Sequence, residues 1–318
     1  MWHRRPRGLS ASWLRGPLAL PAAVLVAWVG FAPGAAMAFC RTTTVPVAPN
    51  FQPSREKCWD RGQPLFWKNA CISYDLNRAS SKQVSYDDAA DHITRAFTRW
   101  TGASCPTDGT GTSRVSIDVR DFGPVECGAV KYNQGFGNQN VVVFRDEKWD
   151  KNDSSNTLAL TTVTFNPDTG EIYDADMEVN THEHPVTVRD PVPATGYDFA
   201  SIMTHETGHF LGLAHSGEPR ATMYANYQPG ATAMRNLTQD DITGICTVYR
   251  PDGTRAVLVD KSTPADVCDP TPRHGFAREC APPAQKCAYA PAPPGGAEGS
   301  GVWLAALVAI AVARRRRA

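Results

Sequence analysis

The sequence predicts an α+β domain in the middle of the chain, between residues 64 and 250. Three segments of this region follow residues that cap helices, and short apolar stretches with strand patterns separate them. Hydrophobic residues make up 42% of the 318 residues and charged residues 20%, which gives the chain enough apolar side chains for a buried core. A chain of this length has room for one large or two modest domains.

The three predicted helices each begin beside a capping side chain. In the first, apolar residues recur every three or four positions, as on one face of a helix. The helices and their caps are residues 86–102 after Ser85, a helix running through residue 211 after Asp198, and residues 239–249 after Thr238. Strands are expected where apolar residues alternate or run together, at residues 72–76, 115–119, 141–144, 158–165 and 172–180.

The ends of the chain predict an exported protein. Arginines near the N-terminus precede an apolar stretch over residues 18–31, and Ala36-Met37-Ala38 then fits a signal-peptidase site. We therefore expect residues 1–38 to be a signal peptide; the alternative is a membrane anchor, for which the apolar core is short. Lysine plus arginine equals aspartate plus glutamate, 32 each, so broad nucleic-acid binding is not expected.

The C-terminal region has a different composition. Residues 251–301 are rich in Cys, Pro and Gly and are expected to form a linker. Residues 302–313 form an apolar run, and four arginines follow it. Twelve helical residues span only ~18 Å, less than the ~30 Å of a bilayer core. The order resembles the C-terminal sorting tags of exported bacterial proteins, known from myxobacteria, and implies association with the cell envelope; the alternative is an amphipathic or buried helix.

The second predicted helix carries a metal-ligand pattern. His205 and His209 are four residues apart and project from one helical face, so they can share one metal ion. Gly212 permits the backbone turn that brings in His215 as a third ligand. Three imidazoles leave the fourth tetrahedral position of Zn²⁺ open for water, as in catalytic sites. Glu206 is adjacent to a ligand and can take a proton from that water.

Met223 follows eight residues after His215, and this spacing resembles the Met-turn of the metzincin peptidases. Ser216 directly after the third histidine resembles the matrixin branch in particular. Residues 64–67, 96–100 and 237–245 also resemble the opening, first helix and closing helix of a matrixin catalytic domain. The resemblance implies a zincin fold over residues 64–250, with a twisted, mostly parallel sheet of about five strands and three helices. Residues 39–63 would then be a short N-terminal extension.

The resemblance implies a secreted zinc endopeptidase that takes a protein or peptide substrate. An extended peptide would pair with the edge strand near Leu158, Ala159 and Leu160. Ser201, four residues before the first histidine, and Tyr224 would line the substrate cleft.

Other metal sites can be judged from the same resemblance. Asp174 matches a calcium-binding aspartate, and Asp176 and Glu178 add carboxylates, which suit Ca²⁺; the alternative is a solvated acidic strand end. The stretches that match a second, structural zinc site contain no histidine, so we expect one catalytic Zn²⁺. His182 and His184 are expected to be exposed.

Nine cysteines follow the predicted signal peptide, and in an exported chain they predict disulfides. Proximity in sequence suggests the pairs Cys105–Cys127 and Cys58–Cys71. In matrixins a prodomain thiolate fills the open zinc position, and Cys40 or Cys58 could do so here. Neither lies in that latency motif, so a structural disulfide or a free thiol is favoured.

Two other functions compete with the endopeptidase. One is a surface or adhesive protein that keeps the fold without proteolysis, and Glu206 argues against it because a purely binding site needs no carboxylate there. The other is a zinc amidase or another hydrolase that uses the same three histidines.

Overall fold

The computed structural model describes residues 38–55, 57–107, 109, 111–150, 156–258 and 260–277, and the backbone of Ala305–Ala311. The predicted signal peptide therefore lies outside the described residues, except for Ala38. The same holds for the four C-terminal arginines.

The predicted sheet is confirmed, with four parallel strands and an antiparallel fifth. It contains β2 (Cys71–Asn77), β5 (Asp118–Val125), β6 (Val141–Phe144), β7 (Thr157–Phe165) and β8 (Ile172–Val179). The order across the sheet is β5-β2-β6-β8-β7, and only β7 runs against its neighbour. Four of the five strands agree with the predicted strands.

The strand predicted at residues 115–119 is misplaced. β5 begins at Asp118, although Val115 and Ile117 are buried as the alternation suggested. Between them, the Ser116 N–H donates to the carbonyl of Tyr249 at 3.2 Å. The alternating pattern thus correctly indicates which side chains are buried in the core. It does not indicate a strand that pairs in the sheet.

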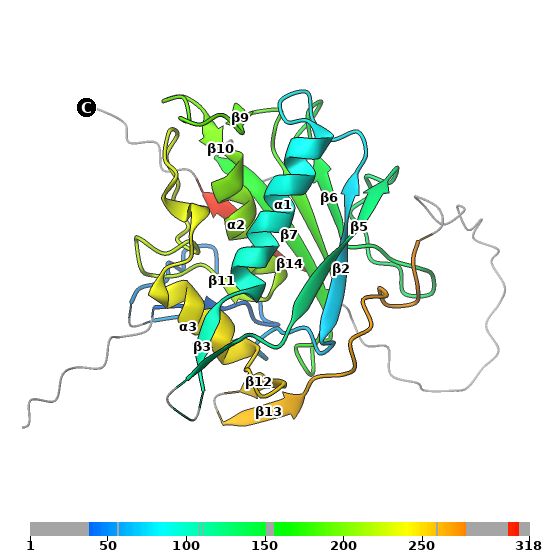
Figure 1. Ribbon diagram of the computed structural model, residues 1–318, viewed down its shortest axis with the longest axis vertical. Helices are drawn as coiled ribbons and strands as arrows, with labels where there is room; N and C mark the ends of the chain where they lie inside the picture. Colours follow the sequence, from blue (N-terminus) through cyan, green and yellow to red (C-terminus); the bar gives the residue numbers. More distant parts are fainter. Residues whose placement is uncertain are drawn as a thin grey trace, which may run out of the picture. The chain divides into compact units, whose positions relative to one another are not determined.

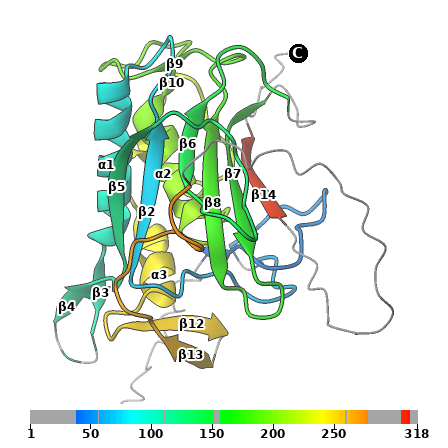
Figure 2. The same cartoon turned by 90° about the vertical axis from the view of Figure 1, so that its right-hand side faces the viewer.

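A sixth strand, β14 (Ala305–Ala311), pairs with the outer edge of β7 in antiparallel register, from Ala305 opposite Thr164 to Ala311 opposite Thr157. Figure 2 shows it beside β7. It lies within the apolar run for which a sorting tag is predicted. None of the helices in the described part of the chain combines the length and hydropathy needed to span a bilayer.

The three predicted helices are confirmed as α1 (Tyr86–Thr101), α2 (Phe199–Phe210) and α3 (Gln239–Val248). Asp198 caps α2 by accepting from the Ser201 N–H at 3.0 Å. Helices α1 and α2 pack against one face of the sheet (Figures 1 and 2). On this face the ring of Tyr74 from β2 stacks on Phe97 of α1, with centroids 4.8 Å apart. The indole N–H of Trp100 donates to the Thr204 carbonyl of α2 at 2.8 Å.

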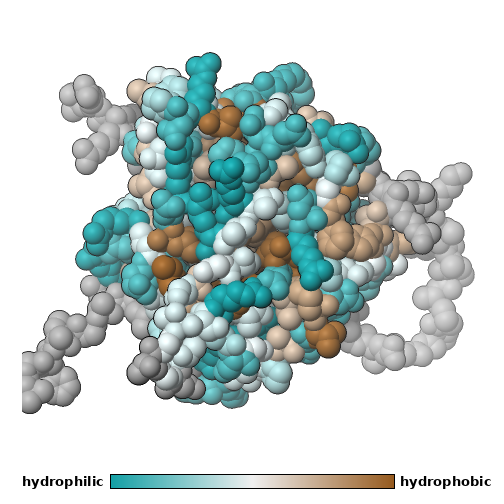
Figure 3. Space-filling model, in the orientation of Figure 1, coloured by the Kyte–Doolittle hydropathy of each residue, from teal (hydrophilic) through white to brown (hydrophobic). Residues whose placement is uncertain are grey.

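Short elements surround this core. They are β1 (Cys40–Arg41) with β11 (Leu213–Ala214), β3 (Ser104–Pro106) with β4 (Thr112–Arg114), β9 (Val186–Thr187) with β10 (Tyr197–Asp198), β12 (Thr254–Leu258) with β13 (Lys261–Pro264), and the 3₁₀ helix η1 (Ala233–Arg235). The surface seen in Figure 3 is mostly hydrophilic, with small separate hydrophobic areas.

Residues 251–277 pack against the domain, although the composition predicts a linker there. Arg255 in β12 is fully buried and donates to the carbonyls of Trp67 and Ser116. A disulfide joins Cys268 to Cys71 of β2. Composition alone does not reveal these contacts because they join residues more than 130 positions apart.

The disulfides correct both predicted pairs. The described bonds are Cys40–Cys58, Cys71–Cys268 and Cys105–Cys246. Cys127 is also disulfide-bonded. The predicted pairs Cys105–Cys127 and Cys58–Cys71 are wrong because packing, and not distance along the chain, brings cysteines together. For example, β3 packs beside α3, and this contact places Cys105 of β3 next to Cys246 of α3.

Candidate metal centre and active site

The three predicted zinc ligands converge at the end of α2. The ring centroids of His205 and His209 are 4.6 Å apart, and that of His215 lies 5.2 Å and 4.9 Å from them. One nitrogen of each ring lies within 4.8 Å of those of the other two. Within the described ranges, this is the one group of three or more His, Cys, Asp or Glu side chains close enough to hold a metal ion.

Backbone carbonyls set the protonation of two of these rings. Nδ1 of His205 lies 2.7 Å from the Thr222 carbonyl, and Nδ1 of His209 lies 2.8 Å from that of Leu213. Because a carbonyl only accepts, each Nδ1 must carry the proton and donate it. Nε2 of each ring then keeps its lone pair for a metal.

These rings are held in the neutral form that binds metal. Burial, together with the neighbouring imidazoles, lowers the pKa of His205 and His209 well below the ordinary value, and burial lowers that of His215 to about 4. Nε2 of all three rings is buried and has no hydrogen-bond partner. Buried polar atoms without partners are rare, and three converging neutral imidazoles fit Zn²⁺ with an open fourth position.

Gly212 makes the turn between the second and third ligands. Its φ is +88°, in the left-handed region that glycine adopts without strain. A Cβ atom there would lie 2.9 Å from the carbonyl oxygen of Leu65. The turn and the close approach both explain why the pattern has glycine at this position.

Glu206 is fully buried beside the histidines. Its Oε2 accepts a hydrogen bond from the Thr161 hydroxyl at 2.6 Å, and its Oε1 has no partner. Burial raises the pKa of Glu206 to about 8. The carboxyl group thus has one oxygen held by β7 and one oxygen available to a reacting molecule.

Met223 packs against α2, where a Met-turn is predicted. Its Sδ fills the space next to Gly208, only 2.3 Å from where a Cβ of that residue would lie. The N–H groups of Thr222 and Met223 donate to the carboxylate of Asp241 at 2.9 Å and 3.1 Å. The turn is therefore fastened to the start of α3.

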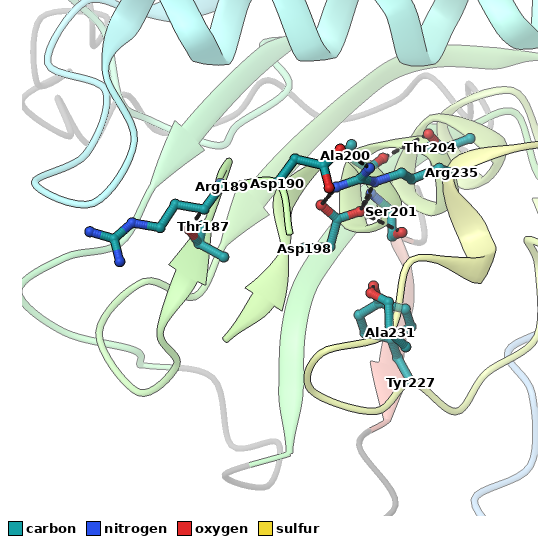
Figure 4. Close-up of polar contacts among 10 residues, drawn as sticks. All are labelled: Thr187, Arg189, Asp190, Asp198, Ala200, Ser201, Thr204, Tyr227, Ala231 and Arg235. Carbon is teal, nitrogen blue, oxygen red and sulfur yellow. Dashed lines mark hydrogen bonds and ion pairs between the residues drawn. The ribbon is translucent and has the colours of Figure 1, made fainter. Parts of the chain in front are cut away.

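The N-terminus of α2 is held by an ion pair (Figure 4). Nε and Nη2 of Arg235 donate to the two carboxylate oxygens of Asp198 at 2.8 Å and 2.9 Å. The Ser201 hydroxyl donates to the same carboxylate at 2.7 Å, and Ser201 is fully buried. Ser201, predicted to line the substrate cleft, thus directs its hydroxyl to the helix cap. Arg235 also donates to Asp190 at 3.1 Å.

The other predicted cleft residues lie in β7 and directly after the Met-turn methionine. Leu158, Ala159 and Leu160 are buried in β7, on the edge that pairs with β14. Tyr224 directly follows the Met-turn methionine and is partly buried against the core.

The three predicted calcium ligands are buried, so a solvated strand end is excluded. Asp174 and Asp176 interact with each other, and Oδ1 of Asp174 has no partner. Asp176 also accepts from the Val141 N–H at 2.8 Å. Glu178 instead accepts from Nε of Arg145 at 2.8 Å, which separates its role from that of the aspartate pair.

Sequence reasoning missed the side chains that support the centre. Thr161, Arg235 and the carboxylate of Asp241 reach the site from other elements, and no local pattern marks these contacts. The expectation that both nearby histidines are exposed is right for His182 and wrong for His184, which is 8% exposed and packs on Tyr197.

Parts of this chain are similar to known proteins. Residues 66–250 match the family model described as Matrixin. Human neutrophil collagenase is 41% identical over 78 residues, covering 24% of this chain and 16% of that protein. Human matrilysin is 46% identical over 54 residues, covering 17% and 20%. The hatching enzyme of Paracentrotus lividus is 26% identical over 193 residues, covering 60% and 26%.

The matches therefore span about a quarter or less of the length of these relatives. The family model, in contrast, covers more than half of this chain and includes all three converging histidines, Glu206 and Met223. On that coverage, the chain belongs to the matrixin family.

Proposed function

We propose that this protein is a secreted zinc endopeptidase that hydrolyses peptide bonds in protein or peptide substrates. One observation carries the proposal: three unpartnered Nε2 atoms converge next to a buried carboxyl group that has one free oxygen. Family membership supports the same activity.

Different residues of the chain would bind the metal, transfer the proton and support the site. His205, His209 and His215 would hold the metal. When bound, the metal would polarise the carbonyl group of the substrate and lower the pKa of its bound water to about 7. Oε1 of Glu206 is placed to accept a proton from the attacking water and to give it to the leaving amine. Met223 supports the centre from below without donating to the metal.

The edge of β7 is the proposed substrate-binding strand. An extended peptide can add to a sheet edge through backbone hydrogen bonds, and Leu158, Ala159 and Leu160 lie on that edge. The cleft would extend to Tyr224 and to the start of α2, where Ser201 lies. Because β14 pairs with the same edge, Ala305–Ala311 must be absent or displaced when substrate binds.

We also propose bacterial export and processing at both ends. The signal peptide would be removed after Ala38, and the C-terminal tag would direct the protein to the cell envelope before the arginine-containing end is cut away. Intact-mass measurement of protein from its native host tests this, and a mature mass that includes the four arginines would contradict removal of the tag.

A calcium ion is a further proposal, for the Asp174–Asp176 pair. Burial, and after it the neighbouring Asp174, raises the pKa of Asp176 well above its ordinary value, and Oδ1 of Asp174 has no partner. A buried carboxyl pair of this kind suits a hard cation with oxygen ligands. Ca²⁺ should raise the melting temperature of the zinc-loaded protein and should not raise that of Asp174→Asn. An equal effect on both proteins would exclude this site.

The endopeptidase itself is tested with purified mature protein and a peptide library. We expect internal cleavage, inhibition by phenanthroline and recovery on adding Zn²⁺. Glu206→Gln should lower kcat by about 10²- to 10⁴-fold while one Zn²⁺ per chain remains bound. Activity of Glu206→Gln within tenfold of the wild type, or zinc binding without peptide hydrolysis by the wild type, would overturn the proposal. The second result would favour an adhesive protein.

A further inference from the structure

Thr161 lies at the middle of β7, on the side of the sheet that faces the helices. It pairs with Met177 of β8, whose side chain belongs to the same core as α1 and α2. Thr161 is fully buried. Its neighbour Thr162 points to the opposite face, because successive side chains alternate along a strand.

The hydroxyl of Thr161 makes one strong contact. It lies 2.6 Å from Oε2 of Glu206 and 3.3 Å from the carbonyl oxygen of the same residue. A hydroxyl has a single proton to donate, and the shorter distance assigns it to the carboxylate. Both groups are buried, so this hydrogen bond is made in a low-dielectric environment where it is stronger than in water.

Each reactive side chain of α2 is held from outside the helix. His205 is held by the Thr222 carbonyl and His209 by that of Leu213. Among the described residues, Thr161 provides the corresponding side-chain contact to Glu206. A glutamate side chain has three rotatable bonds, so without this contact its carboxylate can occupy several staggered positions.

We propose that Thr161 is a positioning residue for the proton-transferring Glu206. Its hydroxyl holds Oε2 and leaves Oε1 as the oxygen that meets the attacking water. The inference rests on the proposed function, and it adds that the strand expected to bind substrate also orients the catalytic carboxylate. One strand thereby couples the placement of the peptide to the placement of the base.

The test compares Thr161→Val, which keeps the shape and removes the hydroxyl, with Thr161→Ser, which keeps the hydroxyl. We expect Thr161→Val to lower kcat about 10- to 100-fold, because small misplacements of reacting groups have effects of this size. KM should stay within about twofold of the wild type, and Thr161→Ser should recover most of the lost kcat. One Zn²⁺ per chain should remain in each variant.

Thr162→Val is the matched control. It removes a buried hydroxyl that has no partner from the adjacent position of the same strand, and kcat should not change. A crystal structure of zinc-loaded Thr161→Val should show the Glu206 carboxylate in more than one position, which gives a readout independent of activity.

The inference is overturned if Thr161→Val keeps the wild-type kcat, if the loss falls on KM or zinc content, or if Thr161→Ser is as impaired as Thr161→Val. These results differ from failure of the proposed function. If the proposed function itself fails, the wild type will not cleave peptides, or Glu206→Gln will remain active.

Discussion

Gly208 lies between the two histidines of α2, at a point where the core has no space for a side chain. An added Cβ would lie 2.3 Å from Sδ of Met223 and 2.8 Å from Cζ2 of Trp100. Replacing glycine with alanine inside a helix normally stabilises a protein by about 0.5–1 kcal/mol. Here the clash with a rigid indole and with the Met-turn should reverse the sign.

We therefore expect Gly208→Ala to lower the melting temperature and the zinc content together. Gly128→Ala is the control, because its nearest neighbour would lie 3.6 Å away, an ordinary contact distance. Calorimetry and metal analysis of both variants provide the measurement. A Gly208→Ala protein as stable as the wild type would show that Met223 and Trp100 can move aside without loss.

Asp75 is a second residue whose environment makes a prediction. It is 3% exposed, and its Oδ2 has no partner. Burial, with a smaller contribution from Asp121, raises the pKa of Asp75 from 3.8 to about 6. The folded state then binds more protons than the unfolded state between these two values, so stability falls as pH rises through this window.

Asp75→Asn removes this titration. The difference in unfolding free energy between the variant and the wild type should therefore change with pH. It should grow in favour of the variant by roughly 1–3 kcal/mol as the pH rises from 4 to 7. Denaturant unfolding at several pH values measures the difference, and the exposed Asp168→Asn serves as the control. A constant difference across this range would mean that Asp75 does not titrate there.

At the scale of elements, the N-terminal segment is fastened to the loop that carries the third histidine. β1 pairs with β11, and the Thr42 hydroxyl donates to the Leu213 carbonyl at 2.9 Å. That carbonyl also accepts from His209. The Cys40–Cys58 disulfide closes the segment, so neither sulfur is a thiolate that could occupy the metal's open position.

Thiol-modifying reagents such as mercurials should therefore not activate the mature protein. Reduction should instead lower its melting temperature, because it frees the ends of the loop that Cys40–Cys58 closes and the longer loops of the other bonds. Peptidase assays with and without each reagent test this. A large rise in activity that disappears in Cys40→Ser or Cys58→Ser would establish a cysteine switch.

At the scale of the whole molecule, the family match ends at residue 250, but the packed chain continues to residue 277. The segment after the match supplies buried Arg255 and the disulfide partner of Cys71. Further along, the Arg273 guanidinium lies 3.6 Å above the ring of Tyr173 in β8. These contacts make the segment part of the folded domain.

A chain that ends at residue 250 should consequently be much less stable than one that ends at residue 277. The shorter chain leaves the buried carbonyls of Trp67 and Ser116 without donors, and each such loss costs about 1–3 kcal/mol. Both chains would begin at residue 39, and their thermal unfolding would be compared. Equal melting temperatures would show that residues 251–277 form a linker, as their composition suggests.

The sequence by itself determined the local features of this protein. Helical spacing places His205, Glu206 and His209 together on α2, and the capping residues mark where each helix begins, because these relations act within a few residues. Only the tertiary structure decided the contacts between residues far apart in the sequence. Thr161 contacts Glu206 because the sheet packs against α2. Cys71 bonds to Cys268 because the segment after residue 250 packs back onto the domain. Such contacts depend on many weak interactions acting together, so no short pattern in the sequence specifies them.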